Sequence, residues 1–285
     1  MQRLDYYMNT MNIFTNAFTD HSCLNKPPKN FKWIFNKRPE NNEPVVYFDD
    51  FIFNYIDDGY TGPKYGWLGE SSEVIHHLIA AIERNIESFK KVYKKIYTND
   101  RRLIERHPDF FEYNPPASNM TWIKDCKIYD KSLTCSFITS FKSFTSGHIK
   151  RVMLYRDLEN NPMFKGHIYG RDCNPLKDKL DGLKDYRFSI AMENTVYPKY
   201  YTEKILDCFA TGTIPIYYGD RSIGEDFDSN GIIFLDDLKS FEDLTEERYI
   251  NMMPAIKHNF EKVMNLKTSD DCLYESVTND SIKYS

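Results

Sequence analysis

The sequence has no long apolar run, no close cysteine pair and only 12 glycines. Its apolar stretches, such as 214–218 and 232–235, are far shorter than the roughly 18 residues needed to cross a bilayer. The six cysteines are scattered without a C-x-x-C pair, so we expect reduced thiols, and no cysteine–histidine cluster has zinc spacing. Residues 1–12 lack a basic segment followed by an apolar core, so no signal peptide is expected. These absences predict a cytoplasmic chain without a transmembrane segment.

What the sequence does contain is typical of a globular protein. Its 285 residues exceed the usual length of one domain, which favours two. Hydrophobic residues make up 41% and aromatic residues 15%, enough for more than one core, and this argues against collagen, coiled coil or disorder. The net charge of −5 gives no overall attraction to nucleic acid or to an anionic membrane, which leaves only a local basic patch for that role.

The pattern of apolar residues predicts alternating strands and helices. A helix is expected to begin at Ser72, because apolar residues recur every three to four positions from there to Phe89. The remaining elements expected in the first half are strands at 12–18, 45–48, 65–69 and 92–97 and a short helix at 100–106. The second half predicts strands at 133–139, 166–169, 187–192, 213–218 and 232–235, with helices at 147–158, 203–211 and 241–266.

This alternation predicts right-handed crossovers and parallel sheets, hence an α/β fold. We place the first domain at residues 1–128 and the second at 129–266. The remaining segment, 267–285, is polar and weakly patterned. It is expected either to fray or to pack back on the first domain.

The segment 186–205 carries the strongest signal of a binding site. A buried strand ends at Glu193-Asn194, and a helix follows after Thr202, its expected N-cap. Ligands of parallel α/β sheets bind at the carboxyl ends of strands, and helix N-termini favour anions. Lys204 in the first turn is unfavourable for the helix dipole unless an anion offsets it, which suggests a diphosphate site. The alternative is an ordinary helix start with a solvated lysine.

Three motifs in this region resemble a known family. They are Tyr-x-Phe-x-Ile-Ala-x-Glu-Asn at 186–194, Tyr-x-Thr-Glu-Lys-Ile at 200–205 and Gly-Thr-x-Pro-x-x-Tyr-Gly at 212–219. Together they are similar to the donor-binding signature of α-1,3-fucosyltransferases. The resemblance extends over roughly 130–260, and the chain looks like the short phage and marine-virus members. It implies a GT-B architecture, with two Rossmann-like domains facing across a cleft. It also implies inverting transfer from a GDP-sugar without metal or cofactor, in the host cytoplasm if the source is viral.

The resemblance also implies roles for individual residues. Glu203 matches the glutamate that contacts the donor sugar, Lys204 the lysine on the diphosphate and Tyr200 the tyrosine that lines the nucleotide site. Arg151 looks like the arginine that neutralises the leaving diphosphate, for which a planar guanidinium is well suited. His148 is as well explained by a capping or structural role as by a ligand role. The expected donor-binding set is Arg151, Glu193, Asn194, Tyr200, Thr202, Glu203 and Lys204.

An inverting transferase needs a general base for the acceptor hydroxyl. The turn at 67–72 resembles the family's apolar-Glu-Ser-Pro turn, whose glutamate is the assigned base, and it places Glu70 in that role. Here Ser72 stands where proline is usual and Gly69 replaces a bulkier residue. Glu73 is the alternative base, and Glu70 can also be interpreted as an acid at the helix N-terminus.

Two further features concern metal and acceptor. Asp226-Phe227-Asp228 has the spacing by which other glycosyltransferases hold a metal on a diphosphate, but its polar context favours a solvated loop, so no metal is expected. Residues 90–106 are locally basic in an acidic protein, which indicates either a solvated face or a surface for a polyanion such as DNA. The basic residues are Lys90, Lys91, Lys94, Lys95, Arg101, Arg102 and Arg106.

The expected function is therefore transfer of fucose, or a close relative such as D-arabinopyranose, from a nucleotide-sugar donor to a glycan. The alternative is a phage-type DNA glycosyltransferase that modifies a hydroxylated base, for example by adding arabinose to hydroxymethylcytosine reached by base flipping.

Overall fold

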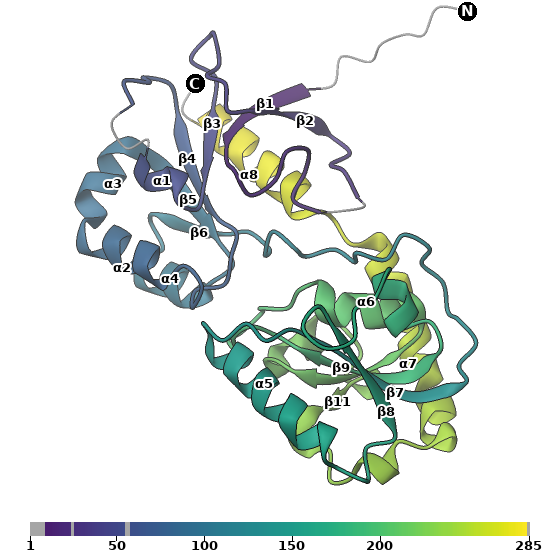
Figure 1. Cartoon of the computed structure of the whole chain (residues 1–285). Coiled ribbons are helices and arrows are strands. Elements are labelled where there is room, and N and C mark those ends of the chain that lie inside the picture. The colour runs from purple at the N-terminus through teal and green to yellow at the C-terminus, as the bar shows by residue number, and fades with distance from the viewer. Residues whose placement is uncertain (1–8, 24–25, 55–57, 284–285) are drawn as a thin grey trace, which may run out of the picture. The chain divides into compact units, whose positions relative to one another are not determined.

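The computed structural model describes residues 9–23, 26–54 and 58–283 (Figure 1). The chain divides into two compact units, a first unit of Met1–Ala117 with Lys267–Ser285 and a second unit of Ser118–Leu266. The division precedes the boundary expected at 128/129. The reason is that residues 118–122 hydrogen-bond to the second unit: the Ser118 carbonyl accepts the Glu203 N–H at 2.9 Å, and the Thr121 hydroxyl donates to Asp207 at 2.6 Å.

The first unit is built on a parallel sheet with the order β2-β1-β3-β4-β5-β6. Its strands are β1 (Asn9–Phe14), β2 (Phe31–Phe35), β3 (Val45–Phe48), β4 (Lys64–Leu68), β5 (Tyr93–Thr98) and β6 (Phe111–Tyr113). Its helices are α1 (Phe51–Asn54), α2 (His76–Arg84), α3 (Ile86–Val92), α4 (Arg101–Arg106) and α8 (Ser269–Lys283).

The structure departs from the expectations for this unit in several places. The strand expected at 12–18 lies at Asn9–Phe14, and α1 and β6 were not predicted. The helix expected from Ser72 begins only at His76, because residues 71–75 form a turn, and it is interrupted at Asn85 between α2 and α3. Strand β2 was not predicted, since Phe31–Phe35 follows a Pro/Lys/Asn-rich stretch and is too short to show a clear period.

The C-terminal segment packs on the first unit rather than fraying. Figure 1 shows α8, in yellow, beside β1 and β2. The indole Nε1 of Trp33 donates to Asp270 at 2.6 Å, and the Tyr65 hydroxyl donates to Asp280 at 3.0 Å. These partners lie more than 200 positions apart in sequence, so the first unit is completed only by the end of the chain.

The second unit is built on a parallel sheet with the order β11-β10-β9-β7-β8. Its strands are β7 (Leu133–Thr139), β8 (Gly166–Gly170), β9 (Tyr186–Met192), β10 (Ile214–Tyr218) and β11 (Ile233–Phe234), and its α-helices are α5 (Ser146–Glu159), α6 (Glu203–Thr211) and α7 (Glu246–Asn265). Gly212 ends α6 with φ of +71°, a left-handed conformation that favours glycine. The helix expected from Phe241 begins at Glu246, and Phe241–Asp243 is a separate 3-10 turn.

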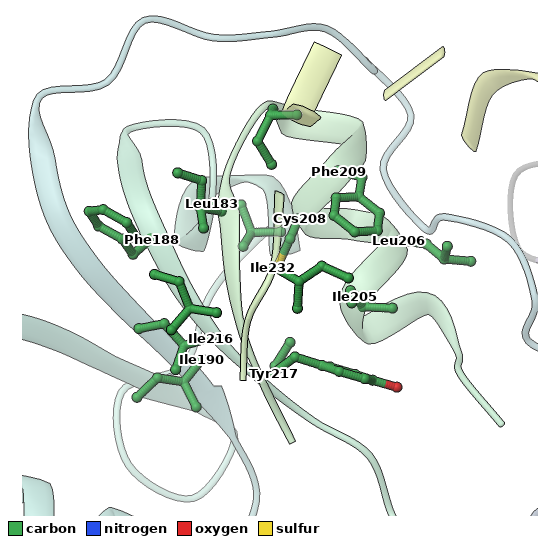
Figure 2. Close-up of a cluster of buried hydrophobic side chains, with 14 of the residues drawn as sticks. Leu183, Phe188, Ile190, Ile205, Leu206, Cys208, Phe209, Ile216, Tyr217 and Ile232 are labelled. Atoms are coloured by element: carbon green, nitrogen blue, oxygen red, sulfur yellow. The ribbon is translucent and has the colours of Figure 1, made fainter. Parts of the chain in front are cut away.

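Apolar side chains of β9, β10 and α6 form the core of the second unit (Figure 2). Ile190 and Ile216 come from the two central strands, and Ile205 and Phe209 from α6 packed against them. This packing fixes the start of α6 next to the carboxyl ends of β9 and β10, which is where ligands bind in parallel sheets. Within the described residues, none of the helices combines the length and the apolar character that crossing a bilayer requires.

Candidate functional site

The candidate site begins with Glu193, the first residue after β9. Its N–H donates to the Tyr218 carbonyl at 2.9 Å, which extends the pairing of β9 with β10 by one step. Its side chain is fully buried. One carboxylate oxygen accepts the Thr202 N–H at 2.9 Å and the other accepts the Thr202 hydroxyl at 2.8 Å. Glu193 therefore fixes the residue from which α6 starts.

The N-terminus of α6 lacks the expected cap. Thr202 occupies the N-cap position, but its hydroxyl donates to Glu193 and makes no cap hydrogen bond to the helix. The first helical N–H, that of Glu203, is accepted by the Ser118 backbone carbonyl at 2.9 Å. The first N–H groups of a helix carry a partial positive charge and need acceptors. Since Thr202 forms no side-chain cap, the N–H groups that follow Glu203 in the first turn of α6 are suited to an anion.

Lys204 and Glu203 lie in the first turn of α6. The Lys204 ammonium is 3.4 Å from a Glu193 oxygen and 3.4 Å from a Glu203 oxygen, and it donates to the Thr202 hydroxyl at 2.9 Å. Burial tends to raise the pKa of Glu203, but the positive charges of Lys204 and Lys179 lower it below its usual value. Glu203 is therefore an ionised carboxylate, and Lys204 is held by two acids rather than free in solvent.

Arg151 approaches the same place from α5. It is 6% exposed, and its Nη2 donates to the Met192 carbonyl at 2.7 Å and to the Asn194 side-chain oxygen at 3.1 Å. Burial lowers its pKa, while the charges of Glu193 and Glu203 oppose that shift. Because the pKa of arginine starts above 12, the side chain remains a cation.

A glycine allows α5 to approach this closely. The Gly147 N–H donates to the Asn194 carbonyl at 3.0 Å, and a Cβ at Gly147 would lie 2.2 Å from the Glu193 carbonyl oxygen. Any other residue here would push the N-terminus of α5 away from the end of β9. The sequence therefore requires glycine at this contact.

His148 is a buried neutral ring beside the cations. The residue that caps α5 is Thr145, whose hydroxyl accepts the His148 N–H at 3.2 Å. Burial lowers the pKa of the imidazole to about 4, and the charges of Arg151 and Lys142 lower it further. Its Nδ1 is buried and finds no hydrogen-bond partner within the described part of the chain. The structure thus excludes a capping role for the side chain of His148.

Tyr200 is buried in the loop that leads to α6. Its ring lies 4.7 Å from that of Tyr197, and its carbonyl accepts the Tyr217 hydroxyl at 3.5 Å. The Tyr200 hydroxyl also raises the pKa of Arg151 electrostatically, so the two side chains lie close together. The structure therefore brings together the donor-binding residues that the sequence predicts, namely Arg151, Glu193, Asn194, Tyr200, Thr202, Glu203 and Lys204.

Sequence reasoning missed an ion pair beneath α6. The Lys179 ammonium lies 2.5 Å from one oxygen of Asp207, a fully buried carboxylate. The other oxygen accepts the Thr121 hydroxyl at 2.6 Å and the Trp122 N–H at 2.7 Å. The sequence held one hint of this pair. Glu203 and Asp207 are four positions apart, which places two acids on the same face of a largely apolar helix.

The Asp-x-Asp sequence has structural partners. Asp226 lies 3.0 Å from the Lys199 ammonium, and Asp228 accepts the Asn230 N–H at 2.9 Å. Phe227 between them is buried in the core of the second unit. Among the residues that the structure describes, no group of three or more His, Cys, Asp or Glu side chains is arranged to hold a metal.

The first unit carries the candidate base. Glu70 lies two residues beyond β4 with an exposed side chain. Since α2 begins at His76, Glu70 lies in the turn at the strand end and not in the helix, which removes the interpretation as a helix N-terminal acid. The alternative base, Glu73, is half-buried in the turn before α2.

The basic residues of 90–106 are largely engaged within the first unit. Lys90 lies 2.6 Å from Asp109, and Arg106 lies 2.8 Å from Glu83. Further contacts are made by Arg102 with Asp100 at 2.7 Å, by Lys95 with the Asp109 carbonyl at 3.1 Å and by Arg101 over the Tyr113 ring at 5.6 Å. Such pairing weakens the field that a polyanion would meet.

Parts of the sequence are similar to known fucosyltransferases. The α-(1,3)-fucosyltransferase FucT of Helicobacter pylori is 34% identical over 85 residues, which is 30% of this chain and 17% of that protein. The α-(1,3)-fucosyltransferase B of Drosophila melanogaster is 38% identical over 73 residues, or 25% of this chain and 16% of that protein. The matches therefore span less than a fifth of these relatives' own length.

Solved structures show the same fold. Crystal structures of an α1,3-fucosyltransferase with GDP and with GDP-fucose each match 94% of this chain and 94% of their own, with a TM-score of 0.52. The sequence identities are 15% and 14%, so the likeness concerns the fold. It confirms the α/β fold of GT-B type that the sequence predicts.

The family match covers the region in which the candidate donor site lies. Residues 130–273, about half of the chain, match glycosyltransferase family 10 (fucosyltransferase), in the C-terminal part of that family. This confirms the resemblance inferred from the motifs at 186–194, 200–205 and 212–219. The chain belongs to glycosyltransferase family 10, the fucosyltransferases.

Proposed function

We propose that this protein is an inverting glycosyltransferase that moves fucose, or a closely related sugar, from a GDP-sugar to a hydroxyl group of a glycan. The observation that carries the proposal is the meeting of Arg151, Lys204 and the first turn of α6 at the carboxyl ends of β9 and β10. The crystal structures of similar fold contain GDP and GDP-fucose, which supports the same donor class here.

The second unit supplies the charges that a leaving diphosphate needs. Arg151 adds a buried guanidinium charge whose Nη2 is anchored on Met192 and Asn194. Helix α6 adds the N–H groups of its first turn that follow Glu203, whose own N–H is accepted by Ser118. Lys204 adds a point charge that Glu193 and Glu203 hold in place. Because these groups are fixed before the reaction, charge that develops on the diphosphate is stabilised without reorganisation. In this proposal the reaction needs no metal ion.

The first unit supplies the base. Glu70 takes the proton of the acceptor hydroxyl as the oxygen attacks the anomeric carbon. The new bond joins acceptor oxygen to sugar, the bond from sugar to diphosphate breaks, and GDP leaves with the electron pair. Attack from the face opposite to the leaving group inverts the anomeric configuration. The exposed position of Glu70 supports this role, because a base must reach a hydroxyl that arrives from solvent.

The donor sugar is fucose or a sugar of the same stereochemistry. D-Arabinopyranose differs by lacking one methyl group, and one methyl contributes only about 1–3 kcal/mol to discrimination in an apolar pocket. Family membership favours fucose. Both sugars therefore belong in the assay.

The test is a transfer assay with labelled GDP-fucose and GDP-arabinose. The acceptors are a panel of glycans and, in a separate arm, DNA that contains hydroxymethylcytosine. We expect transfer to a glycan, with inverted anomeric configuration by NMR, since most of the basic segment is already paired. Transfer to DNA alone would replace the glycan assignment by the DNA alternative, and retention of configuration would overturn the mechanism.

A further inference from the structure

A second carboxyl group lies behind the proposed base. Strands β3 and β4 pair in parallel, with Phe48 opposite Trp67, so their carboxyl ends meet at one edge of the sheet. Asp49 is the first residue after β3, and Glu70 comes two residues after β4. The two acids are therefore neighbours at that edge, and the charge of Glu70 acts on the Asp49 carboxyl.

Asp49 holds the turn that carries Glu70. One of its carboxyl oxygens accepts the Gly69 N–H at 3.0 Å, and its own N–H donates to the Trp67 carbonyl at 2.9 Å. From the end of β5, the Asn99 amide nitrogen lies 3.4 Å from the Gly69 carbonyl and 3.3 Å from the Glu70 carbonyl. The backbone on both sides of Glu70 is thus held by side chains from the two neighbouring strands.

The rest of the fold does not explain this carboxyl group. Helix α1 starts nearby, but its Ile52 N–H is accepted by the backbone carbonyl of Asp49, at 2.9 Å, and not by the side chain. Asp49 has φ of +43°, a left-handed conformation that is costly for residues other than glycine and best tolerated by Asn and Asp. A glycine would satisfy the backbone here without placing an acid in the protein interior.

The acid is also costly because it is buried. Asp49 is only 9% exposed. Burial raises its pKa well above the usual value and the negative charge of Glu70 adds to this, whereas hydrogen bonds from the backbone N–H groups of Gly69 and Glu70 oppose it. Asp50, the other charged neighbour that acts on it, is acidic too. The Asp49 carboxyl group therefore lies where its charge is disfavoured, and the backbone N–H groups of the turn are what stabilises it there.

We propose that Asp49, together with Asn99, is a positioning residue that holds the Gly69–Glu70 peptide so that the Glu70 carboxylate meets the acceptor hydroxyl. This inference rests on the proposed function, in which Glu70 is the base. It predicts that loss of the Asp49 carboxyl lowers kcat and leaves the affinity for GDP unchanged, because the donor groups lie in the second unit.

The experiment compares Asp49→Gly with Asp49→Asn. Glycine keeps the left-handed backbone without strain and removes only the side chain, whereas asparagine keeps an oxygen that can accept the Gly69 N–H. We expect Asp49→Gly to lower kcat by about 10- to 100-fold, as misplacement of a catalytic group by about an ångström does. Asp49→Asn should restore kcat to within about threefold of the wild type, because it retains this acceptor. The matched control is Asp50→Asn, an exposed neighbouring acid that should leave kcat unchanged.

Two results would overturn the inference: wild-type kcat in Asp49→Gly, or an equal loss of kcat in Asp49→Gly and Asp49→Asn. If Asp49→Gly does not fold, Asn99→Ala tests the same turn from the other side, and wild-type kcat in that variant would contradict the proposal. Failure of the proposed function gives a different pattern, since Glu70→Gln would then retain kcat whatever the Asp49 variants do.

Discussion

The two units hold their functional acids and bases in different ways. In the second unit, Glu193 and Glu203 are buried and paired with Lys204, and Arg151 is buried beside them. In the first unit, Glu70 is exposed, and Asp49 and Asn99 hold the backbone of its turn. A fixed set of charges suits a diphosphate whose shape does not vary, while an exposed carboxylate suits a hydroxyl that must enter and leave.

The largest effect should come from the exposed acid. Glu70→Gln removes the base and keeps the shape of the side chain, so kcat should fall by about 10²- to 10⁴-fold, the usual contribution of general base catalysis. The affinity for GDP, measured by calorimetry, should not change. A Glu70→Gln variant that turns over like the wild type would move the base role to Glu73, which the matching Glu73→Gln variant then tests.

The buried ion pair beneath α6 should have the next largest effect, and on stability rather than rate. Lys179→Met leaves the Asp207 carboxylate buried without its cation, which typically lowers the free energy of unfolding by about 3 kcal/mol. Urea unfolding of the wild type and the variant measures this. The control is Lys184→Met, which removes the cation of a half-buried ion pair with Asp181, and equal destabilisation by both substitutions would show that the buried pair has no special role.

A smaller effect is expected when the guanidinium of Arg151 is replaced by an ammonium group. Arg151→Lys keeps the charge but loses the paired donors to Met192 and Asn194, so transfer should slow by about tenfold. Steady-state kinetics with saturating acceptor would measure it. Wild-type kinetics in this variant would mean that charge alone, without the planar fork, is what the site requires.

The effect of His148 is confined to acid pH and is absent at neutral pH. Its pKa falls from 6.5 to about 4 on folding, so between these values the unfolded chain binds more protons than the folded one. Folding stability should therefore fall as pH falls from 6.5 to 4, and His148→Gln should flatten this slope by at most about one proton. Unfolding free energies from urea titrations at several pH values provide the test. An unchanged slope would contradict the assignment of a neutral buried ring.

The two units also differ in how far they could be predicted from the sequence. Strand 133–139 and helix 203–211 were predicted to the residue, because regular strand–helix alternation and a terminal Gly212 define them. The first unit is less regular. Its strand β2 is short, and α8 shows little amphipathic pattern, since several of its buried groups are the acids that bond to Trp33, Lys29 and Tyr65.

The same distinction holds within the site. The pattern of a strand end followed by a helix start pointed to Glu193 and Lys204, and the resemblance to the fucosyltransferase family pointed to Arg151, because such motifs are local in the sequence. Side-chain direction was not predictable: the Thr202 hydroxyl bonds Glu193 instead of capping α6. The sequence also did not predict the ion pair of Lys179 with Asp207 or the hydrogen bond of Asp49 with Gly69. The partners in each pair lie at least 20 positions apart, so the contact depends on how the strands and helices are placed in the fold.

The most direct test of the donor site is calorimetric titration with GDP and, separately, UDP in the presence of EDTA. The proteins are the wild type, Lys204→Ala and the control Lys257→Ala, which changes an exposed lysine of α7 in the same unit. We expect GDP to bind the wild type and the control, UDP to bind neither, and Lys204→Ala to lose GDP binding. Binding of UDP instead, a requirement for metal, or undiminished GDP binding by Lys204→Ala would contradict this expectation.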